Sequence, residues 1–190
     1  GCTFTGGKAS LFINGQAIAE ATEVTYTPAS SGLLTIGKSN AAALGQPFNG
    51  RMDELTIYTT SLNDLRLQAM PGLAFQEQFG TIGYWKLDDL SGATASDNSA
   101  MSSNGTLNGG MTFENNAVAG IRGKALSFDG TDDYIRITNG TSTPGTGFSV
   151  SLWVYPTAVK TWARFIDFGN GGGSDNILLA RNSNKIGRAH

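Results

Sequence analysis

Acidic side chains are the residues of this chain that could do chemistry, and several occur as adjacent pairs. The pairs are Asp53-Glu54, Asp88-Asp89 and Asp132-Asp133. Neighbouring residues on a strand point to opposite faces, so none of these pairs forms the facing acid and base that glycoside hydrolysis requires. The only histidine is His190, and the sequence contains no nucleophile elbow and no phosphate-binding glycine loop. The sequence therefore predicts a protein that is not an enzyme.

A long stretch rich in Ser, Asn and Gly, residues 89–110, offers oxygen ligands for a cation. Asp97, Ser99 and Asn104 supply side-chain oxygens, and the backbone around Gly105 adds a carbonyl. Calcium takes about six to eight such oxygens without a regular spacing, so this loop is a candidate calcium site. The alternative is that Asp97 caps a turn by accepting backbone hydrogen bonds, as Asp and Asn often do. The residues alone leave both interpretations open.

A second acidic group lies further along the chain. Asp132 and Asp133, together with Asp129, are candidate metal ligands or glycan contacts. Asp129 is followed by Gly130, however, and this pair has the composition of a tight turn. Turn formation is the favoured explanation for these residues.

The three tryptophans suggest stacking against a sugar ring. Trp162 follows a loop and is the best candidate for an exposed aromatic platform. Trp85 and Trp153 lie within strand-like runs, which favours packing in the core or on a sheet face for both.

The composition is that of an all-β globular protein. The chain has 190 residues, 39% of them hydrophobic, and 26 glycines placed between short apolar runs. Its net charge is −2, with 13 basic and 15 acidic residues, which argues against nucleic acid or an anionic membrane as a partner. No apolar run is long enough to cross a membrane, and the single Cys2 cannot form an internal disulfide.

Several stretches have the pattern of short strands. Asn14-Gly15 between apolar runs predicts a hairpin over residues 8–18 with a type I′ turn. Asp129-Gly130 predicts a second antiparallel hairpin over residues 123–137. Residues 148–155 alternate strictly, with Phe148, Val150, Leu152 and Val154 on one face and Ser149, Ser151, Trp153 and Tyr155 on the other.

Two further elements follow from periodicity. A strand over residues 52–58 is expected to place Met52, Glu54, Thr56 and Tyr58 on one face, and Asp53, Leu55 and Ile57 on the other. From Ser61 to Met70 the apolar residues recur every three or four positions, which predicts a short helix capped by Ser61.

In this order the motifs resemble a laminin-G-like, concanavalin-A-type jelly-roll domain of the kind found in bacterial secreted proteins. Residues 83–181 are similar to its N-terminal half, and residues 8–70 to its C-terminal half. The features that carry the resemblance are Tyr84-Trp85-Lys86-Leu87-Asp88, Asn104-Gly105-Thr106-Leu107, residues 123–130, Phe148 to Val154, Leu11 to Gly15, Leu34 to Gly37 and Phe48 to Tyr58.

This resemblance implies a two-sheet antiparallel jelly-roll sandwich with one short helix. Residues 1–72 would be the C-terminal half of a first domain, 73–82 a linker, 83–185 the N-terminal half of a second domain, and 186–190 a non-native tail. Neither half closes a sandwich alone, so we expect the two halves to dock as one hybrid domain. The family commonly holds calcium between the loop and an acidic residue near the last strand, which implies that Asp53 completes the site at Asp97.

The resemblance also implies a function. It points to a non-catalytic recognition module, secreted or on a bacterial cell surface, that binds a glycan or a cell-surface protein with loops shaped by calcium. The alternatives are a structural or adhesion spacer without a small ligand, and an appendage of a glycoside hydrolase whose catalytic domain lies elsewhere. The sequence indicates no particular oligomeric state.

Overall fold

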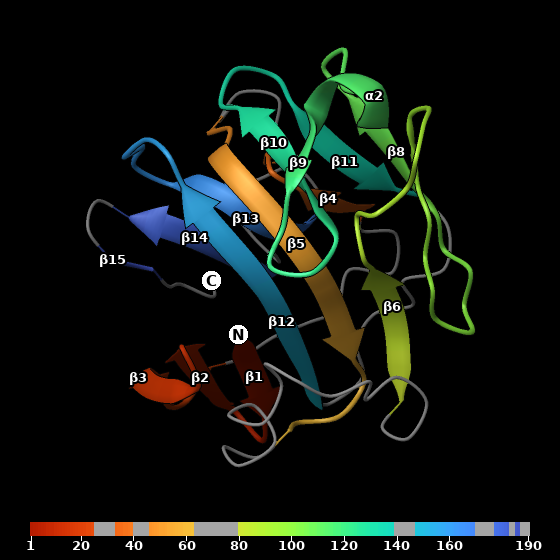
Figure 1. Ribbon diagram of the computed structural model, residues 1–190. Helices are drawn as coiled ribbons and strands as arrows, with labels where there is room; N and C mark the ends of the chain where they lie inside the picture. The colour runs from red at the N-terminus through yellow and green to blue at the C-terminus, as the bar shows by residue number, and fades with distance from the viewer. Residues whose placement is uncertain are drawn as a thin grey trace.

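Two antiparallel sheets face each other in this protein (Figure 1). The computed structural model describes residues 1–24, 33–39, 46–62, 80–138, 147–169, 177–182 and 185–186. Sheet A contains β1 (Cys2–Thr5), β2 (Lys8–Ile13), β3 (Gln16–Ala21), β5 (Asn49–Tyr58), β6 (Thr81–Trp85), β9 (Ala117–Ala119), β10 (Lys124–Asp129) and β12 (Gly147–Pro156). Sheet B contains β4 (Leu33–Ile36), β7 (Thr94–Ala95), β8 (Gly105–Asn108), β11 (Tyr134–Ile137), β13 (Ala163–Gly169), β14 (Ile177–Asn182) and β15 (Lys185–Ile186). The predicted all-β sandwich is confirmed.

The core lies between the two sheets and is built from their inward-facing apolar side chains. The ring of Phe48 lies 6.0 Å from the ring of Phe128 in sheet A and 5.1 Å from that of Phe165 in sheet B, measured between centroids. Along β12, Phe148 and Val150 are buried in this core, as the strict alternation predicts. Facing side chains from both sheets therefore hold the layers together.

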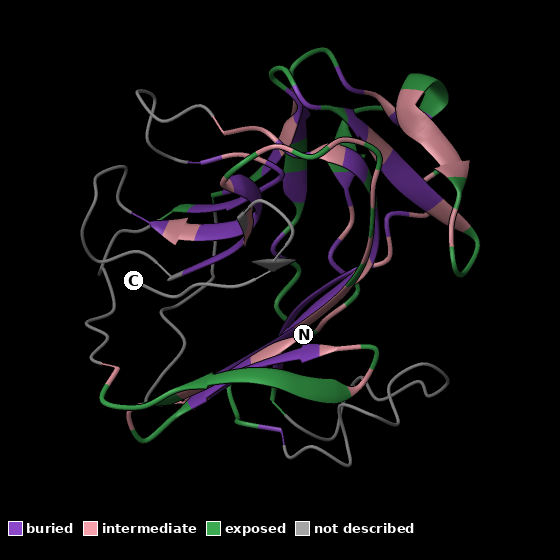
Figure 2. Cartoon of the chain, turned by 90° about the vertical axis from the view of Figure 1, so that its left-hand side faces the viewer, coloured by how far each residue is buried: buried purple, intermediate pink, exposed green. Residues whose placement is uncertain are grey.

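The hairpin at residues 8–18 is confirmed. Asn14 and Gly15 have φ values of 50° and 77°, the left-handed pair that a type I′ turn needs, and they join β2 to β3. Every residue of β3 is exposed, as the green strand at the bottom of Figure 2 shows. Among the described residues β3 is thus an edge strand that packs on no other layer.

The second predicted hairpin, over residues 123–137, is wrong. β10 pairs with β5 and β9 in sheet A, whereas β11 pairs with β4 and β8 in sheet B. The residues between them cross from one sheet to the other. As a result, Phe128 and Ile135 both contribute to the core, but from opposite sheets. Alternation and turn composition are the same for a hairpin and for such a crossing, so the sequence could not separate them.

The expected faces of the strand at residues 52–58 are also wrong. Glu54 has a φ of 53°, and the pairing of β5 with β12 shifts register beside it. This bulge inserts one residue, so Met52 and Leu55 both face the core while Asp53 lies on the outer face. The bulge therefore places the Asp53 carboxylate on the outer face of sheet A, where it is nevertheless buried.

The N-terminal segment (residues 1–62) and the C-terminal segment (residues 80–186) share both sheets. β5 lies between β12 and β10, and β4 lies between β13 and β11. The expected docking of the two segments into one sandwich is present. Their origin in two consecutive domain copies, with boundaries near residues 72 and 83, stays a prediction.

The described part of the chain contains little helix. The helix expected from Ser61 to Met70 lies almost wholly outside the described residues. A short helix that the sequence did not indicate, α2 (Phe113–Asn116), begins after Thr112, whose side chain accepts a hydrogen bond from the Asn115 backbone. No helix in the described part of the chain is long and apolar enough to span a bilayer.

Candidate functional site

Asp97 organises the loop that follows β6. Its Oδ1 accepts hydrogen bonds from the backbone N–H groups of Tyr84 (2.8 Å) and Ser99 (2.9 Å). Its Oδ2 accepts from the backbone N–H of Ser103 and from the Ser99 hydroxyl, both at 2.8 Å. The Asp97 N–H in turn donates to Oδ1 of Asn104 at 2.9 Å. Asp97 is the centre of a closed hydrogen-bond network.

This network bears on the calcium interpretation of the loop. Each carboxylate oxygen of Asp97 already accepts two hydrogen bonds, so a cation would have to displace backbone donors. Gly105 is buried at the start of β8, where a Cβ would lie 2.5 Å from Ile135 Cγ2. Asp97, Ser99 and Asn104 come together as the sequence predicted, but their geometry matches the turn-capping alternative.

Asp53 lies in a different place, on the outer face of sheet A opposite Trp153. Its Oδ2 accepts hydrogen bonds from the backbone N–H groups of Ile121 (2.7 Å) and Arg122 (3.2 Å). Its Oδ1 is buried and has no hydrogen-bond partner in the structure. A buried carboxylate oxygen without a donor is costly, so this atom marks a position that a cation could stabilise.

Two other carboxylates act on Asp53. Burial raises the pKa of Asp53 to about 6; the two backbone hydrogen bonds oppose this rise, and the charges of Glu54 and Asp88 add to it. Asp88 Oδ1 accepts a hydrogen bond from the Lys124 N–H at 2.5 Å, and Glu54 Oε2 accepts one from the Tyr84 hydroxyl at 2.5 Å. We call Asp53 and the two residues whose charges act on it, Glu54 and Asp88, the carboxylate cluster; the described carboxylates that come within 4.8 Å of one another are instead Asp129, Asp132 and Asp133. The carboxylate cluster gathers negative charge without a basic ion-pair partner among the described residues.

The raised pKa of Asp53 predicts how stability depends on pH. A carboxyl whose pKa is higher in the folded state takes up its proton on folding, so the folded state should gain stability as the pH falls from 7 to about 5. We expect a gain of about 1 kcal/mol from this group over that range. In Asp53→Asn the gain should disappear, because the amide keeps the Oδ acceptor for the backbone donors and does not titrate in this range.

The measurement is urea unfolding at several pH values between 4.5 and 7.5, with a chelator present. The wild-type value minus the Asp53→Asn value isolates Asp53 from the other groups that titrate. A difference that stays constant across this range would contradict the assignment.

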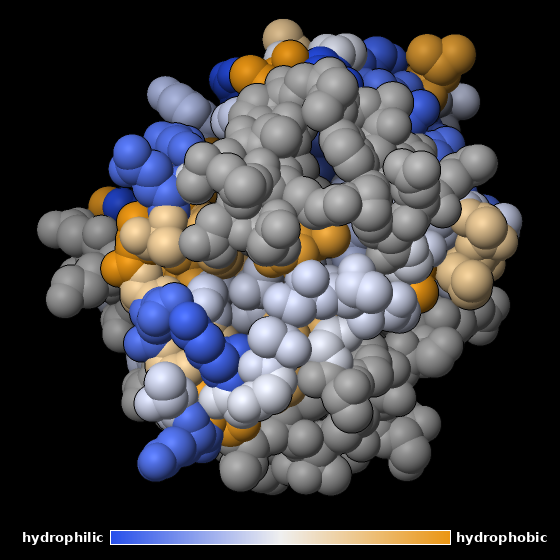
Figure 3. Space-filling model, turned by 90° about the horizontal axis from the view of Figure 1, so that it is seen from below, coloured by the Kyte–Doolittle hydropathy of each residue, from blue (hydrophilic) through white to orange (hydrophobic). Residues whose placement is uncertain are grey.

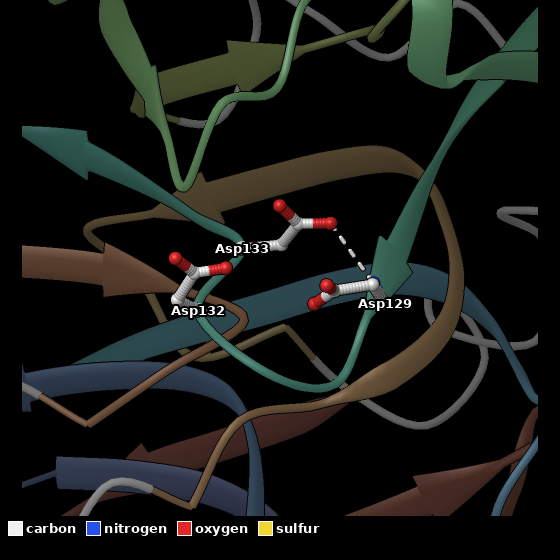
Figure 4. Close-up of side chains that lie close together, drawn as sticks. All are labelled: Asp129, Asp132 and Asp133. Carbon is white, nitrogen blue, oxygen red and sulfur yellow. Dashed lines mark hydrogen bonds between the residues drawn. The ribbon is translucent and has the colours of Figure 1, made fainter.

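Asp129, Asp132 and Asp133 also come together, at the connection between β10 and β11 (Figure 4). One carboxylate oxygen from each lies within 4.8 Å of the others. Asp133 Oδ2 accepts a hydrogen bond from the Asp129 N–H at 2.9 Å, and Asp129 Oδ1 accepts from the Thr131 N–H at 2.6 Å. These bonds are those of an Asp-stabilised turn, the favoured explanation from the sequence.

The charges of this acidic turn agree with a structural role. Burial, and secondarily the charges of Asp129 and Asp132, raise the pKa of Asp133, whereas the Thr131 N–H lowers the pKa of Asp129. The ammonium of Lys160 donates to the Gly130 carbonyl and so lies beside the turn. A basic side chain already supplies positive charge here.

The structure separates the three tryptophans. Trp85 is fully buried, as predicted, and its Nε1 donates to the Ser103 carbonyl at 3.2 Å. Trp162 is half-buried, with the Arg164 guanidinium 5.9 Å from its ring centroid. Trp153, which was expected to pack, is instead 37% exposed on the outer face of sheet A.

Trp153 belongs to a surface that the sequence analysis missed. Tyr155, two residues along β12, is 65% exposed, and the Arg51 guanidinium lies 5.7 Å from its ring centroid. We call Arg51, Trp153 and Tyr155 the aromatic face. It adjoins the carboxylate cluster, because Trp153 pairs with Asp53 across the sheet. The alternation of residues 148–155 was the available signal, since it put both aromatic side chains opposite the core residues.

Other parts of the surface offer less. Seen from below, the coloured surface in Figure 3 is largely pale or blue, and the orange residues form separate small groups. The most exposed large apolar side chain, Leu90 at 80%, lies beside Glu114 and Lys124 at an open depression next to β9. Among the described exposed aromatic side chains, Trp153 and Tyr155 are presented together on one side of β12.

A two-sheet antiparallel sandwich of this kind is the architecture of the jelly-roll class of domains. The chain belongs to the concanavalin A-like lectin/glucanases superfamily, because the laminin G family model of that description matches residues 2–68 and 129–189. The first matched block lies mainly in the N-terminal segment, and the second lies mainly in the C-terminal segment. Laminin G-like domains are generally non-catalytic binding modules. No curated protein and no solved structure matches the chain.

Proposed function

We propose that this protein is a non-catalytic, extracellular module that recognises carbohydrate through the aromatic face. Its family fits a module that binds carbohydrate or another partner. The observation that carries the proposal is the joint exposure of Trp153 and Tyr155, at 37% and 65%, on one face of a single strand. A position at a bacterial cell surface is part of the same proposal.

The geometry of these two side chains supports sugar stacking. Residues two apart on a strand lie about 7 Å from each other on the same face, which suits adjacent rings of a glycan chain. Each aromatic ring offers a flat apolar surface to the apolar face of a pyranose. Arg51 stacks on Tyr155 and adds hydrogen-bond donors for hydroxyl groups at the edge of the face.

Trp153→Ala is expected to weaken glycan binding by about tenfold to a hundredfold, because it removes the larger stacking surface. Glycan-array screening followed by titration calorimetry of the best glycan measures this loss. Trp162→Ala is the matched control, since Trp162 is also a partly exposed tryptophan but lies outside the aromatic face. Equal binding by wild type and Trp153→Ala, or a larger loss in Trp162→Ala, would contradict the proposal.

Calcium bound at the carboxylate cluster is the second part of the proposal. Asp53 Oδ1 has no hydrogen-bond partner, and the carboxylates of Glu54 and Asp88 act on the same group. Hard carboxylate oxygens are the donors that calcium prefers. A cation held by Asp53 and Asp88 would neutralise this charge next to the aromatic face, and both residues already fix the loop at residues 121–124 through backbone bonds.

Millimolar calcium is expected to raise the melting temperature of the wild type by several degrees, because it binds only the folded state. Asp53→Asn should abolish the shift. Asp132→Asn, a change in the acidic turn, should retain it. Differential scanning fluorimetry with calcium or with chelator measures the effect. The absence of a shift in the wild type, or a shift lost only in Asp132→Asn, would exclude the carboxylate cluster.

A further inference from the structure

Strands β4 and β5 pair with no described strand of their own N-terminal segment. β5 pairs with β12, β10 and β6, and β4 pairs with β11 and β13. All five partner strands belong to the C-terminal segment. Figure 1 shows β5 lying between β12 and β10. Among the described strands, only β1, β2 and β3 pair with one another inside the N-terminal segment.

The C-terminal segment is equally incomplete without these strands. Removing β5 would separate β12 from β10 and β9, and would leave β6 without a described partner. Removing β4 would divide sheet B between β13 and β11. Each sheet of the C-terminal segment therefore contains an open slot one strand wide, with unpaired backbone groups on both sides.

The slot in sheet A is matched to β5 by three features. The ring of Phe48, next to β5, enters the core between Phe128 and Phe165 of the C-terminal segment. Gly50 lies where any Cβ would be 2.8 Å from Pro156 Cα, so only glycine fits that register. Asp53 binds backbone amides of the C-terminal segment. Register, shape and hydrogen bonding thus all select β5.

The connection between the segments is long enough for a second copy to fill the slots. The Thr59 N–H donates to the Gly80 carbonyl at 2.9 Å, so the connection starts and ends at adjacent points. The intervening residues 60–79 could span about 60 Å when extended, which is enough to reach a neighbouring sandwich. The contacts that hold β4 and β5 are the same whether one copy or two provide them.

We propose that the N-terminal segment acts as a strand donor, and that β4 and β5 of one copy insert into the slots of a second copy of this chain. Each sandwich in such an assembly is complete, and each carboxylate cluster combines Asp53 of one copy with Asp88 of the other. In dilute solution β4 and β5 fill the slots of their own chain, because the linker holds them there at a high effective concentration. That concentration is of millimolar order for short linkers. Exchange dominates when copies refold together at high concentration or lie in one array.

Complementation between full-length variants tests this inference. Gly50→Val disables the donor segment, and Gly105→Val disables the acceptor segment, where a Cβ would meet Ile135 at 2.5 Å. Each variant alone should give little native near-ultraviolet circular dichroism. Refolded together, they should recover up to about a quarter of the wild-type signal in a species of dimeric mass, because one sandwich in four combines two intact segments.

The matched control refolds Gly105→Val with Gly83→Val. Both changes lie in the C-terminal segment, so every sandwich carries a defect and no recovery is expected. Wild-type protein provides a measurement that does not depend on misfolded variants: refolding at increasing concentration should increase the dimer fraction in light scattering. Recovery no greater than in the control, or a wild type that stays monomeric at every concentration, would overturn the inference.

Discussion

Replacing Asp97 by alanine is expected to lower the free energy of unfolding by about 3–5 kcal/mol, because several buried donors lose their acceptor together. The backbone N–H groups of Tyr84, Ser99 and Ser103 all donate to this carboxylate. Ser103 also holds the buried Trp85 through its carbonyl, so the loss reaches the core. Asp97 therefore fixes the part of the loop from Ser99 to Ser103 against β6.

Urea unfolding at pH 7 measures this effect, with Asp132→Ala as the control. Asp132 is an exposed acidic residue in a turn, so its removal should cost less than about 1 kcal/mol. Added calcium separates the two interpretations of Asp97. If Asp97 caps the turn, Asp97→Ala stays destabilised by the same amount with calcium or chelator. A destabilisation seen only with calcium present would instead make Asp97 a metal ligand.

Gly50→Ala is expected to destabilise the whole sandwich by about 3 kcal/mol or more, because backbone cannot move aside as a flexible side chain can. A Cβ at Gly50 would lie 2.6 Å from Phe48 Cζ and 2.8 Å from Pro156 Cα, and it would meet the Tyr155 carbonyl. Its φ of +148° is also rare for residues with a side chain. Since β5 joins the two segments, both should unfold together in one transition.

Gly110→Ala is the control for backbone strain. Gly110 also has a positive φ, 85°, but nothing lies within 4 Å of its Cβ position, so only about 1 kcal/mol should be lost. Thermal unfolding followed by far-ultraviolet circular dichroism and by tryptophan fluorescence compares the two variants. Equal losses, or separate transitions for the two signals, would show that β5 does not join the segments as described.

Some features of the candidate site followed directly from the sequence. The gathering of Asp97, Ser99 and Asn104 was predictable because the residues are close in sequence and short polar side chains bind nearby backbone. The Asn14-Gly15 hairpin followed for the same reason, since both residues adopt the left-handed conformation that its turn requires. Interactions between residues a few positions apart depend on the local sequence, so they can be predicted from it.

What the sequence determined by itself is the class of the fold, through alternation, turn composition and the order of the motifs. Only the tertiary structure decided which face each residue occupies. The bulge at Glu54 moved Asp53 to the outer face, and the crossing after Asp129 sent β11 into the other sheet. Trp153 is exposed, whereas Ser149 on the same side of β12 is buried and bonded to Thr60 and Leu62. The physical reason is that alternation along a strand assigns residues to two opposite faces without saying which face is buried. Long-range strand pairing decides which of the two faces packs against the core.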